Sequence, residues 1–328
     1  MALTTDPSSF SLPPELAAGV AGKRVFITGA GRDKGLGQAF ALAAGLNGAA
    51  GVAVHFHNSY EDGLDTVNML REHGCENAFP VQCDVTNPRD VWSIRSYVIQ
   101  RLGGVPDVVI CNSGASESGY MLGRVPRAQE GESSARRRAR VRQAFVENLA
   151  ESQMVIDTKV DGFLAMTHLW ASEAVFVKQP LTIVYISSRQ AVDAGPAVPG
   201  YVMANWAVLS LPKILHVNLG RSASLVRAFS VGYPFVKTSM TEEYADNPKV
   251  FGRWQDRMLE PHEASKALMQ LLSRPAEELD DRFFQLLVDG APELGEGGIR
   301  TRWSEIAITV SDKALEWSDS APLDLPAD

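Results

Sequence analysis

Short apolar runs alternate with longer amphipathic segments along most of the chain. The apolar runs are rich in Val, Ile, Leu and Phe, and each has the length of a strand. They lie at Arg24–Thr28, Gly51–His57, Ala78–Gln82, Val108–Asn112, Leu181–Ser187, Leu225–Val231 and Phe284–Val288. Continuous apolar strands separated by helix-length segments are typical of a parallel sheet that is covered on both faces. The pattern therefore predicts an α/β fold with seven parallel strands in a single doubly wound domain.

Three segments interrupt this alternation. Residues 1–22 are rich in Ser and Pro and show no periodicity, so we expect an N-terminal arm outside the core. A polar insertion at about 116–153 follows the fourth predicted strand, and a C-terminal extension over 292–328 covers the domain or contacts a neighbouring subunit. We expect the catalytic domain at 23–291.

The polar insertion contains a dense group of arginines. They are Arg136, Arg137, Arg138, Arg140 and Arg142. Such a group is either a solvated helix face or a docking patch for an acidic partner or a phosphate-bearing substrate. The sequence leaves both interpretations open.

The overall composition is that of an ordinary soluble protein with a large core. The chain has 328 residues, of which 45% are hydrophobic and 21% charged. Its 31 Lys and Arg residues are outnumbered by 39 Asp and Glu residues, which gives a net charge of −8. Because phosphate contacts require a basic surface, this balance argues against a dedicated nucleic-acid binder.

Cysteine content and hydropathy indicate a cellular location. Cys75, Cys83 and Cys111 show no metal-ligand spacing, and a small odd number of cysteines is typical of a reducing compartment. The first residues lack the basic and apolar regions of a signal peptide. The least polar stretch, Ala39 to Phe56, is interrupted by several glycines and reads as helix, turn and strand. We expect a cytoplasmic protein with no metal site and no membrane span.

A glycine-rich turn follows the first predicted strand directly, and an Ala-rich helical segment follows the turn. Glycines allow the backbone to approach a pyrophosphate closely, and the N-terminus of a helix attracts its negative charge. The order strand, turn, helix predicts a Rossmann-like dinucleotide site. The candidate residues of the turn are Gly29, Gly31, Gly35, Leu36 and Gly37.

The residues expected near the adenosine ribose favour NADPH over NADH. An NAD site usually has Asp or Glu about 20 residues beyond the glycines, after the second strand. This chain has no acid there before Glu61, and the positions read His57, Asn58 and Ser59. Arg32 and Lys34 in the turn are able to pair with a 2′-phosphate, although two solvated loop charges would give the same pattern.

Five motifs, in this order, resemble those of the short-chain dehydrogenase/reductase family. They are Thr28-Gly29 through Gly37, Cys83-Asp84-Val85, Cys111-Asn112-Ser113-Gly114-Ala115, Ser187-Ser188 thirteen residues before Tyr201, and Val288-Asp289-Gly290. The resemblance covers roughly residues 23–291. It implies that Asp84 and Val85 contact the adenine, that Asn112 and Gly114 border the cofactor, and that Thr238 meets the nicotinamide carboxamide.

The chain departs from the family's pattern at three places. Its glycine turn is two residues longer than the family's common turn, and Tyr233-Pro234 stands where the Pro-Gly after the sixth strand is usual. The family's Tyr-x-x-x-Lys motif ends here in Asn205, and Lys159 stands where most members have the active-site asparagine. Lys and Asn are thus exchanged.

This exchange resembles the ketoreductase domains of modular polyketide synthases, which share the motifs Lys159-Val160-Asp161-Gly162 and Tyr201-x-x-Ala204-Asn205. The resemblance implies that Tyr201 is the general acid and that Ser188 donates a hydrogen bond to the developing alkoxide. Lys159 would lower the pKa of the tyrosine, and Asn205 would take a neutral positioning role.

We therefore expect NADPH-dependent reduction of a β-keto group on an acyl or polyketide thioester. The arginine group would then dock an acyl carrier protein or its phosphopantetheine arm. A free ketone, an alcohol or a cyclised polyketide is the alternative substrate, and an NADP-binding regulator or scaffold without turnover is the alternative function. The family's habit implies a homodimer or homotetramer.

Overall fold

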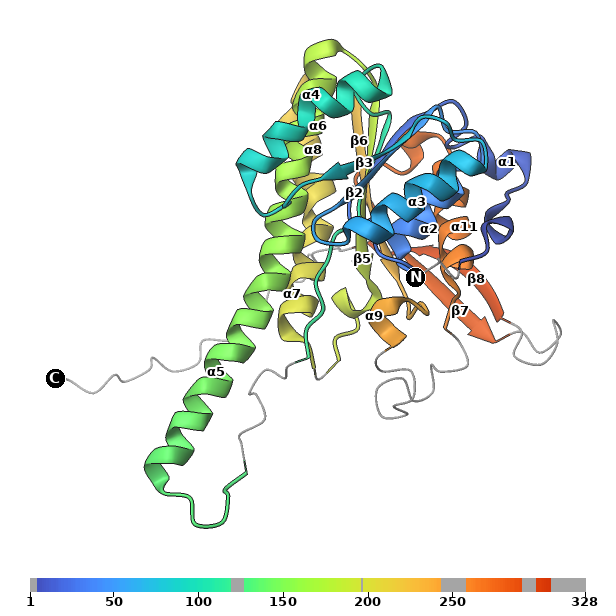
Figure 1. The fold of residues 1–328 in the computed structure, drawn as a ribbon. Helices are drawn as coiled ribbons and strands as arrows, with labels where there is room; N and C mark the ends of the chain where they lie inside the picture. Colours follow the sequence, from blue (N-terminus) through green and yellow to red (C-terminus); the bar gives the residue numbers. More distant parts are fainter. Residues whose placement is uncertain (1–4, 119–126, 196, 243–257, 291–298, 308–328) are drawn as a thin grey trace, which may run out of the picture.

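The computed structural model describes residues 5–118, 127–195, 197–242, 258–290 and 299–307. A single sheet of eight strands, in the order β3-β2-β1-β4-β5-β6-β7-β8, lies between two layers of helices (Figure 1). The strands are β1 (Arg24–Ile27), β2 (Gly51–Phe56), β3 (Ala78–Gln82), β4 (Val108–Cys111), β5 (Leu181–Ser188), β6 (Val226–Tyr233), β7 (Arg282–Gly290) and β8 (Ile299–Glu305).

Strands β1 to β7 are parallel, which confirms the doubly wound α/β prediction. The eighth strand, β8, was not predicted, and it pairs antiparallel with β7 inside the expected C-terminal extension. Its sequence is mostly charged and polar because it is an edge strand with little buried surface. The ring of Trp303 contacts the ring of Tyr233, and Ile299 also packs against the core.

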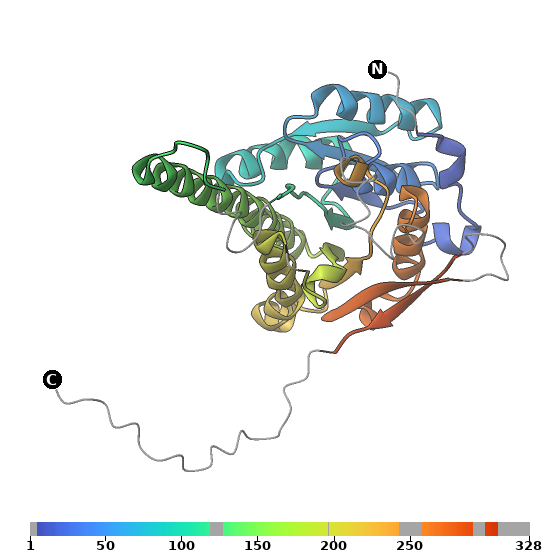
Figure 2. The same ribbon diagram turned by 90° about the horizontal axis from the view of Figure 1, so that it is seen from below.

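Helices cover both faces of the sheet, and each face has its own apolar core. The core between the sheet and α2 (Leu36–Gly45), α3 (Tyr60–Glu72) and α11 (Pro261–Leu272) forms one side. On the other side lie α4 (Pro88–Leu102), α6 (Gly162–Val177) and α8 (Leu211–Leu219) (Figure 2). The shorter helical elements are η1 (Pro7–Phe10), α1 (Pro14–Ala17), η2 (Asp157–Asp161), η3 (Arg189–Ala191), α7 (Pro199–Ala207), η4 (Val208–Ser210), η5 (Gly220–Ser222), α9 (Ser239–Glu242) and η7 (Ala276–Glu278).

The strand order reverses between β1 and β4. From β1 the chain moves outward to β2 and β3, and it then returns to the other side of β1 with β4. In open parallel sheets, ligands bind beyond the carboxyl ends of the strands at such a reversal. This topology therefore places the candidate site above the ends of β1, β4 and β5.

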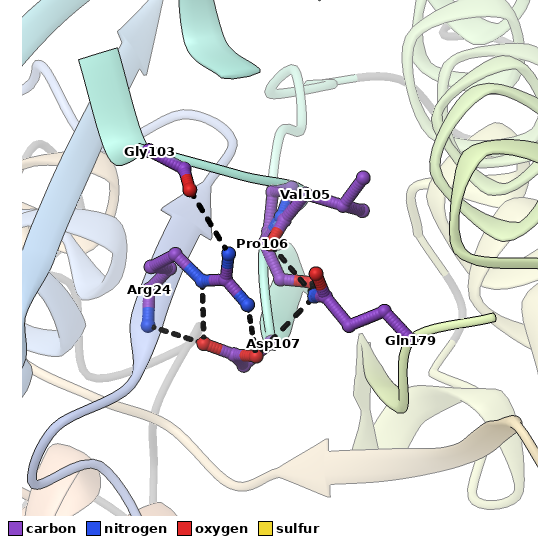
Figure 3. A network of polar contacts seen from close by, with 6 residues as sticks. All are labelled: Arg24, Gly103, Val105, Pro106, Asp107 and Gln179. Atoms are coloured by element: carbon purple, nitrogen blue, oxygen red, sulfur yellow. Dashed lines mark hydrogen bonds and ion pairs between the residues drawn. The ribbon is translucent and has the colours of Figure 1, made fainter. Parts of the chain in front are cut away.

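A polar network fixes β1 against β4 at the opposite end of these strands (Figure 3). The backbone N, Nε and Nη2 of Arg24 donate to the carboxylate of Asp107 at 2.8, 2.9 and 2.8 Å. The side-chain amide of Gln179 donates to the carbonyl oxygen of Val105 at 2.8 Å and to Asp107 at 3.3 Å. These contacts hold the two central strands in register.

The N-terminal segment packs onto the domain. Phe10 and Val20 are buried in the core that also contains α2 and α11. Asn47 holds the segment by accepting from the backbone N of Leu12 and donating to the carbonyl oxygen of Phe10, both at 2.9 Å. The expectation that this arm lies outside the core is therefore wrong for Phe10 and Val20, whereas the domain boundaries stay a prediction.

Much of the polar insertion forms one long helix. Helix α5 (Ser134–Ile156) has 23 residues and extends away from the sheet (Figure 1). Val155 is its buried residue, so most of its surface faces outward. Residues 119–126 of the insertion lie outside the described residues.

Candidate active site

The glycine-rich turn packs tightly against the end of β4. Gly29 has a φ of +66°, and a Cβ atom there would lie 2.9 Å from the Cα of Ser113. A Cβ on Gly37 would collide with the carbonyl oxygen of Gly29, and one on Gly31 would lie 2.5 Å from the Cβ of Phe56. Glycine is required at these positions because side chains have no room.

Within the described part of the chain, no side chain caps the N-terminus of α2. Its N-cap residue, Gly35, supplies no capping side chain, and the first turn, which begins at Leu36, contains no acid. The first N–H groups of a helix need acceptors and attract negative charge. The open helix end and the close-packed glycines fit the pyrophosphate of a dinucleotide.

A buried histidine is hydrogen-bonded to the glycine-rich turn. The Nδ1 atom of His55 accepts from the backbone N of Gly29 at 3.2 Å, and its Nε2 donates to the carbonyl oxygen of Cys83 at 3.1 Å. Burial lowers the pKa of His55 to about 4, so the ring is neutral at pH 7. A role for His55 could not be predicted from the sequence, because its position inside an apolar run does not indicate these contacts.

The candidates for the adenosine end lie along the ends of β2 and β3. His57 and Asn58 are exposed, and Ser59 precedes α3. Val85 is buried and packs so closely on α6 that a Cβ on Gly162 would lie 2.7 Å from its Cγ2. The carboxylate of Asp84 accepts from the backbone N of Thr86 at 2.9 Å, which shapes the turn after β3.

The two basic candidates of the turn differ in their surroundings. Arg32 is exposed. Lys34 has a φ of +53°, and its Nζ lies 3.7 Å from a carboxylate oxygen of Glu242 in α9. Both side chains of this ion pair are largely exposed, so the contact is weak and easily exchanged for another anion.

Asn112 and Thr28 join the ends of β4 and β1. The Nδ2 of Asn112 donates to the carbonyl oxygens of Thr28 and Gly29 at 3.1 and 3.2 Å. The Oγ1 of Thr28 accepts from the backbone N of Asn112 and Ser113 at 2.8 and 3.0 Å. Gly114, the next candidate, is exposed beyond these contacts.

The loop after β6 carries the candidate for the nicotinamide end. Thr238 is half-buried, and its backbone N donates to the Oγ1 of Thr241 at 2.9 Å. Tyr233, which stands in place of the family's usual proline, is the last residue of β6. It is buried, and its hydroxyl donates to the carbonyl oxygen of Ala264 at 3.0 Å. This departure from the family pattern therefore has a core role.

Three of the four predicted catalytic residues come together at α7. Ser188 is the last residue of β5, and Asn205 is fully buried one turn after Tyr201. Burial raises the pKa of the Tyr201 hydroxyl, while hydrogen bonding to the side chains of Ser188 and Asn205 acts in the opposite direction. Within the described residues the Oδ1 of Asn205 is buried and has no hydrogen-bond partner.

Lys159 occupies the neighbouring element. It lies in η2, a π-helical segment between α5 and α6 that packs against α7. Its side chain is buried, and Nζ lies 5.0 Å from the ring centroid of Phe163. Burial lowers its pKa from 10.5 to about 7. Lys159 makes no hydrogen bond to Tyr201 in this structure. The π-helical form of η2 is consistent with a functional site, because such turns occur frequently there.

Among the described residues, no three or more His, Cys, Asp and Glu side chains are grouped in a way that would hold a metal ion. In the same part of the chain, no helix combines the length and the apolar character needed to cross a bilayer.

Comparison with known proteins links this geometry to one family. A family model described as short chain dehydrogenase matches residues 23–249. No curated protein sequence matches the chain significantly.

Solved structures have the same fold. A short-chain type dehydrogenase/reductase from Mycobacterium marinum is 24% identical with a TM-score of 0.66, over 83% of this chain and 97% of that one. A gluconate 5-dehydrogenase from Burkholderia cenocepacia J2315, in complex with NADP and tartrate, is 18% identical with a TM-score of 0.64, over 82% of this chain and 96% of that one. A short chain dehydrogenase from the same organism, in complex with NADP, is 18% identical with a TM-score of 0.62, over 81% and 96%.

Proposed function

Because the chain belongs to the short-chain dehydrogenase/reductase family, we propose that it is an NADPH-dependent ketoreductase that reduces a β-keto group to a hydroxyl. The observation that carries the proposal is the gathering of Ser188, Tyr201 and Asn205 beside the buried Lys159. Ser188 ends β5, and the glycine-rich turn follows β1 two strands away in the sheet, so both lie at the carboxyl ends of the central strands.

NADPH fits the dinucleotide site. The uncapped N-terminus of α2 would hold the pyrophosphate, and the exposed Arg32 would pair with the 2′-phosphate. Lys34 would join it by exchanging its weak contact with Glu242 for the phosphate. Asn112 and Thr238 would border the nicotinamide half. The two similar structures that contain NADP support this choice.

The chemistry assigned to the chain's own side chains is proton transfer and charge stabilisation. NADPH, when bound, supplies a hydride to the carbonyl carbon. Tyr201 would donate its hydroxyl proton to the ketone oxygen, while the Oγ of Ser188 donates a hydrogen bond to the charge that develops there. The ammonium of Lys159 would favour the tyrosinate that remains until solvent returns the proton. Asn205 would keep Tyr201 in place.

The proposed substrate class is supported by the arrangement of arginines on α5. Arg137, Arg138 and Arg142 line a shallow groove with Val141 and Phe145. Arg140 is already paired, since its Nε donates to the carboxylate of Glu132 at 2.7 Å. We propose that the groove receives the acidic surface of an acyl carrier protein, which would deliver a β-ketoacyl or polyketide thioester.

The test is NADPH oxidation, followed by absorbance, on three substrates. These are a β-ketoacyl carrier protein, the same acyl group on a small thiol, and an unattached ketone. We expect turnover that falls at least 100-fold in Tyr201→Phe and Ser188→Ala, with NADPH affinity unchanged. A preference for the unattached ketone would transfer the function to a free ketone or cyclised polyketide. Tight NADPH binding without any turnover would indicate a regulator or scaffold.

Self-association is a separate part of the proposal. Helices α5 and α7 pack together and leave large apolar side chains exposed. On α5 this is Leu149, exposed by 57%, and on α7 they are Met203 and Trp206, exposed by 49% and 50%. A second copy of the chain would cover this surface in a homodimer or homotetramer. Light scattering of the wild type beside Leu149→Asp/Met203→Asp tests it, because the variant should be a monomer.

A further inference from the structure

Helix α7, which carries Tyr201, has no cap of its own. Its N-cap residue is Val198, whose side chain makes no capping hydrogen bond, and whose φ of +55° is unusual for a β-branched residue. Pro199 follows and has no N–H group. The next two N–H groups, of Gly200 and Tyr201, therefore need an acceptor from elsewhere in the chain.

Glu117 supplies this acceptor from the loop after β4. Its Oε2 accepts from the backbone N of Tyr201 at 2.8 Å, and its Oε1 accepts from that of Gly200 at 3.3 Å. Glu117 is 7% exposed, which is rare for a carboxylate in a loop. A negative charge at this end of a helix also interacts favourably with the helix dipole.

The same carboxylate holds α5 against α7. The Oγ of Ser152 in α5 donates to the Oε1 of Glu117 at 2.5 Å. The helices touch closely at this point, because a Cβ on Gly200 would lie 2.6 Å from the Cα of Ser152. Three donors from two helices therefore converge on one buried carboxylate, and a shift of Glu117 would move the first turn of α7.

We propose that Glu117 is a positioning residue that caps α7 from a distance and thereby holds Tyr201 in place for proton transfer. The catalytic half of this inference rests on the ketone reduction proposed above. A carboxylate suits the position because it accepts at both oxygens, whereas an amide accepts at only one. Glu117→Gln would turn a donor toward one of the three converging donors while leaving the size of the side chain unchanged.

The experiment compares Glu117→Gln with a matched control on the same loop contact. Glu151 accepts from the backbone N and Oγ of Ser118 at 3.2 and 3.0 Å, so Glu151→Gln weakens the attachment to α5 without touching α7. Four quantities are measured in each protein: hydrogen exchange of peptides spanning 199–207, the NADPH dissociation constant, and kcat and KM for the best ketone substrate. Glu117→Asp is measured as well, so that a carboxylate variant remains if the glutamine variant does not fold.

We expect Glu117→Gln to exchange faster within 199–207 and to lose about tenfold in kcat, because small displacements of a reacting group are costly. KM and the NADPH dissociation constant should stay within twofold of wild type, and Glu151→Gln should match wild type in all four quantities. Glu117→Asp should fall between wild type and the glutamine variant.

Unchanged exchange within 199–207 in Glu117→Gln would overturn the capping role. Faster exchange with an unchanged kcat would overturn the positioning role, and so would a loss of NADPH binding in parallel with kcat. A wild-type protein that reduces no ketone would overturn the proposed function instead, and the exchange of 199–207 would then decide the inference about Glu117 by itself.

Discussion

Asn205 donates a 2.8 Å hydrogen bond from its Nδ2 to the backbone carbonyl oxygen of Tyr201, one turn earlier on α7. The backbone carbonyl of Asn205 in turn accepts from the Oγ of Ser187 at 2.9 Å, which ties this turn to the end of β5. Asn205 thus acts as a neutral link between the candidate acid and the sheet. The buried positive charge comes instead from Lys159 on the adjacent segment η2.

Because Lys159 supplies the buried charge and Asn205 the neutral link, we expect the effects of substitutions at these two positions on stability to be coupled. Asn205→Lys alone would bury a second ammonium, and each buried cation without a partner is costly. We expect the single variant to unfold at a lower temperature than the exchanged variant Lys159→Asn/Asn205→Lys, which has one buried ammonium. Thermal unfolding of the wild type, both single variants and the double variant gives the coupling energy, expected to be about 1–3 kcal/mol. Additive effects would contradict the coupling.

The burial of Lys159 should lower the free energy of unfolding, although the proposed ketone reduction requires this residue. Its pKa is about 7 in the folded protein and 10.5 without burial, so the folded state binds fewer protons than the unfolded state between these values. Stability should therefore rise as the pH increases from 7 to 10.5. Lys159→Met should remove this dependence and raise the free energy of unfolding at pH 7 by a few kcal/mol, while ketone reduction is lost. Urea unfolding at pH 7 and 9.5 measures both effects, and a less stable methionine variant would contradict them.

The fold could be predicted from the sequence wherever burial determines the residue type. Strands β1 to β7 are buried and apolar, so their pattern is visible. Strand β8 is not, because an edge strand with charged side chains such as Arg302 resembles a loop in sequence. Phe10 gave no signal either, since one aromatic residue in a Ser/Pro-rich segment does not reveal that it is buried.

The candidate site likewise contains some residues that the sequence predicts and others that it does not. Tyr201 and Ser188 have a fixed spacing along the chain, so a motif identifies them before their geometry is known. Glu117 acts on an amide 84 residues away, and His55 on one 26 residues away. Contacts of this kind depend on how strands and loops meet in space. A local sequence pattern therefore does not predict them.

The neutral His55 predicts a loss of stability in mild acid. Its pKa is about 4 in the folded protein and 6.5 in the absence of burial. The unfolded state therefore binds more protons between these values, and stability falls as the pH is lowered from 6.5 to 4. This residue should contribute roughly 3 kcal/mol to that fall. His55→Asn does not titrate, so its free energy of unfolding should vary less over this range. Equal slopes for the two proteins would show that His55 is not responsible.

The arginine groove on α5 predicts a substrate-dependent change in KM. Arg137→Ala/Arg138→Ala removes two charges from the groove, and it should raise KM about tenfold for the carrier-bound β-ketoacyl substrate. KM for the same acyl group on a small thiol should stay the same, because that substrate carries no acidic surface. Arg136→Ala is the matched control, since Arg136 lies outside the groove beside Glu132 and Arg140.

Ionic strength separates charge attraction from a change in the shape of α5. Raising the salt concentration shortens the range of the attraction, so KM of the wild type for the carrier substrate should increase toward that of the double variant. The double variant itself should respond little to salt. An equal rise in KM for both substrates would instead mean that the substitutions disturb α5, which packs against α7, and through it the position of Tyr201. The docking proposal therefore requires that the carrier and the small thiol respond differently.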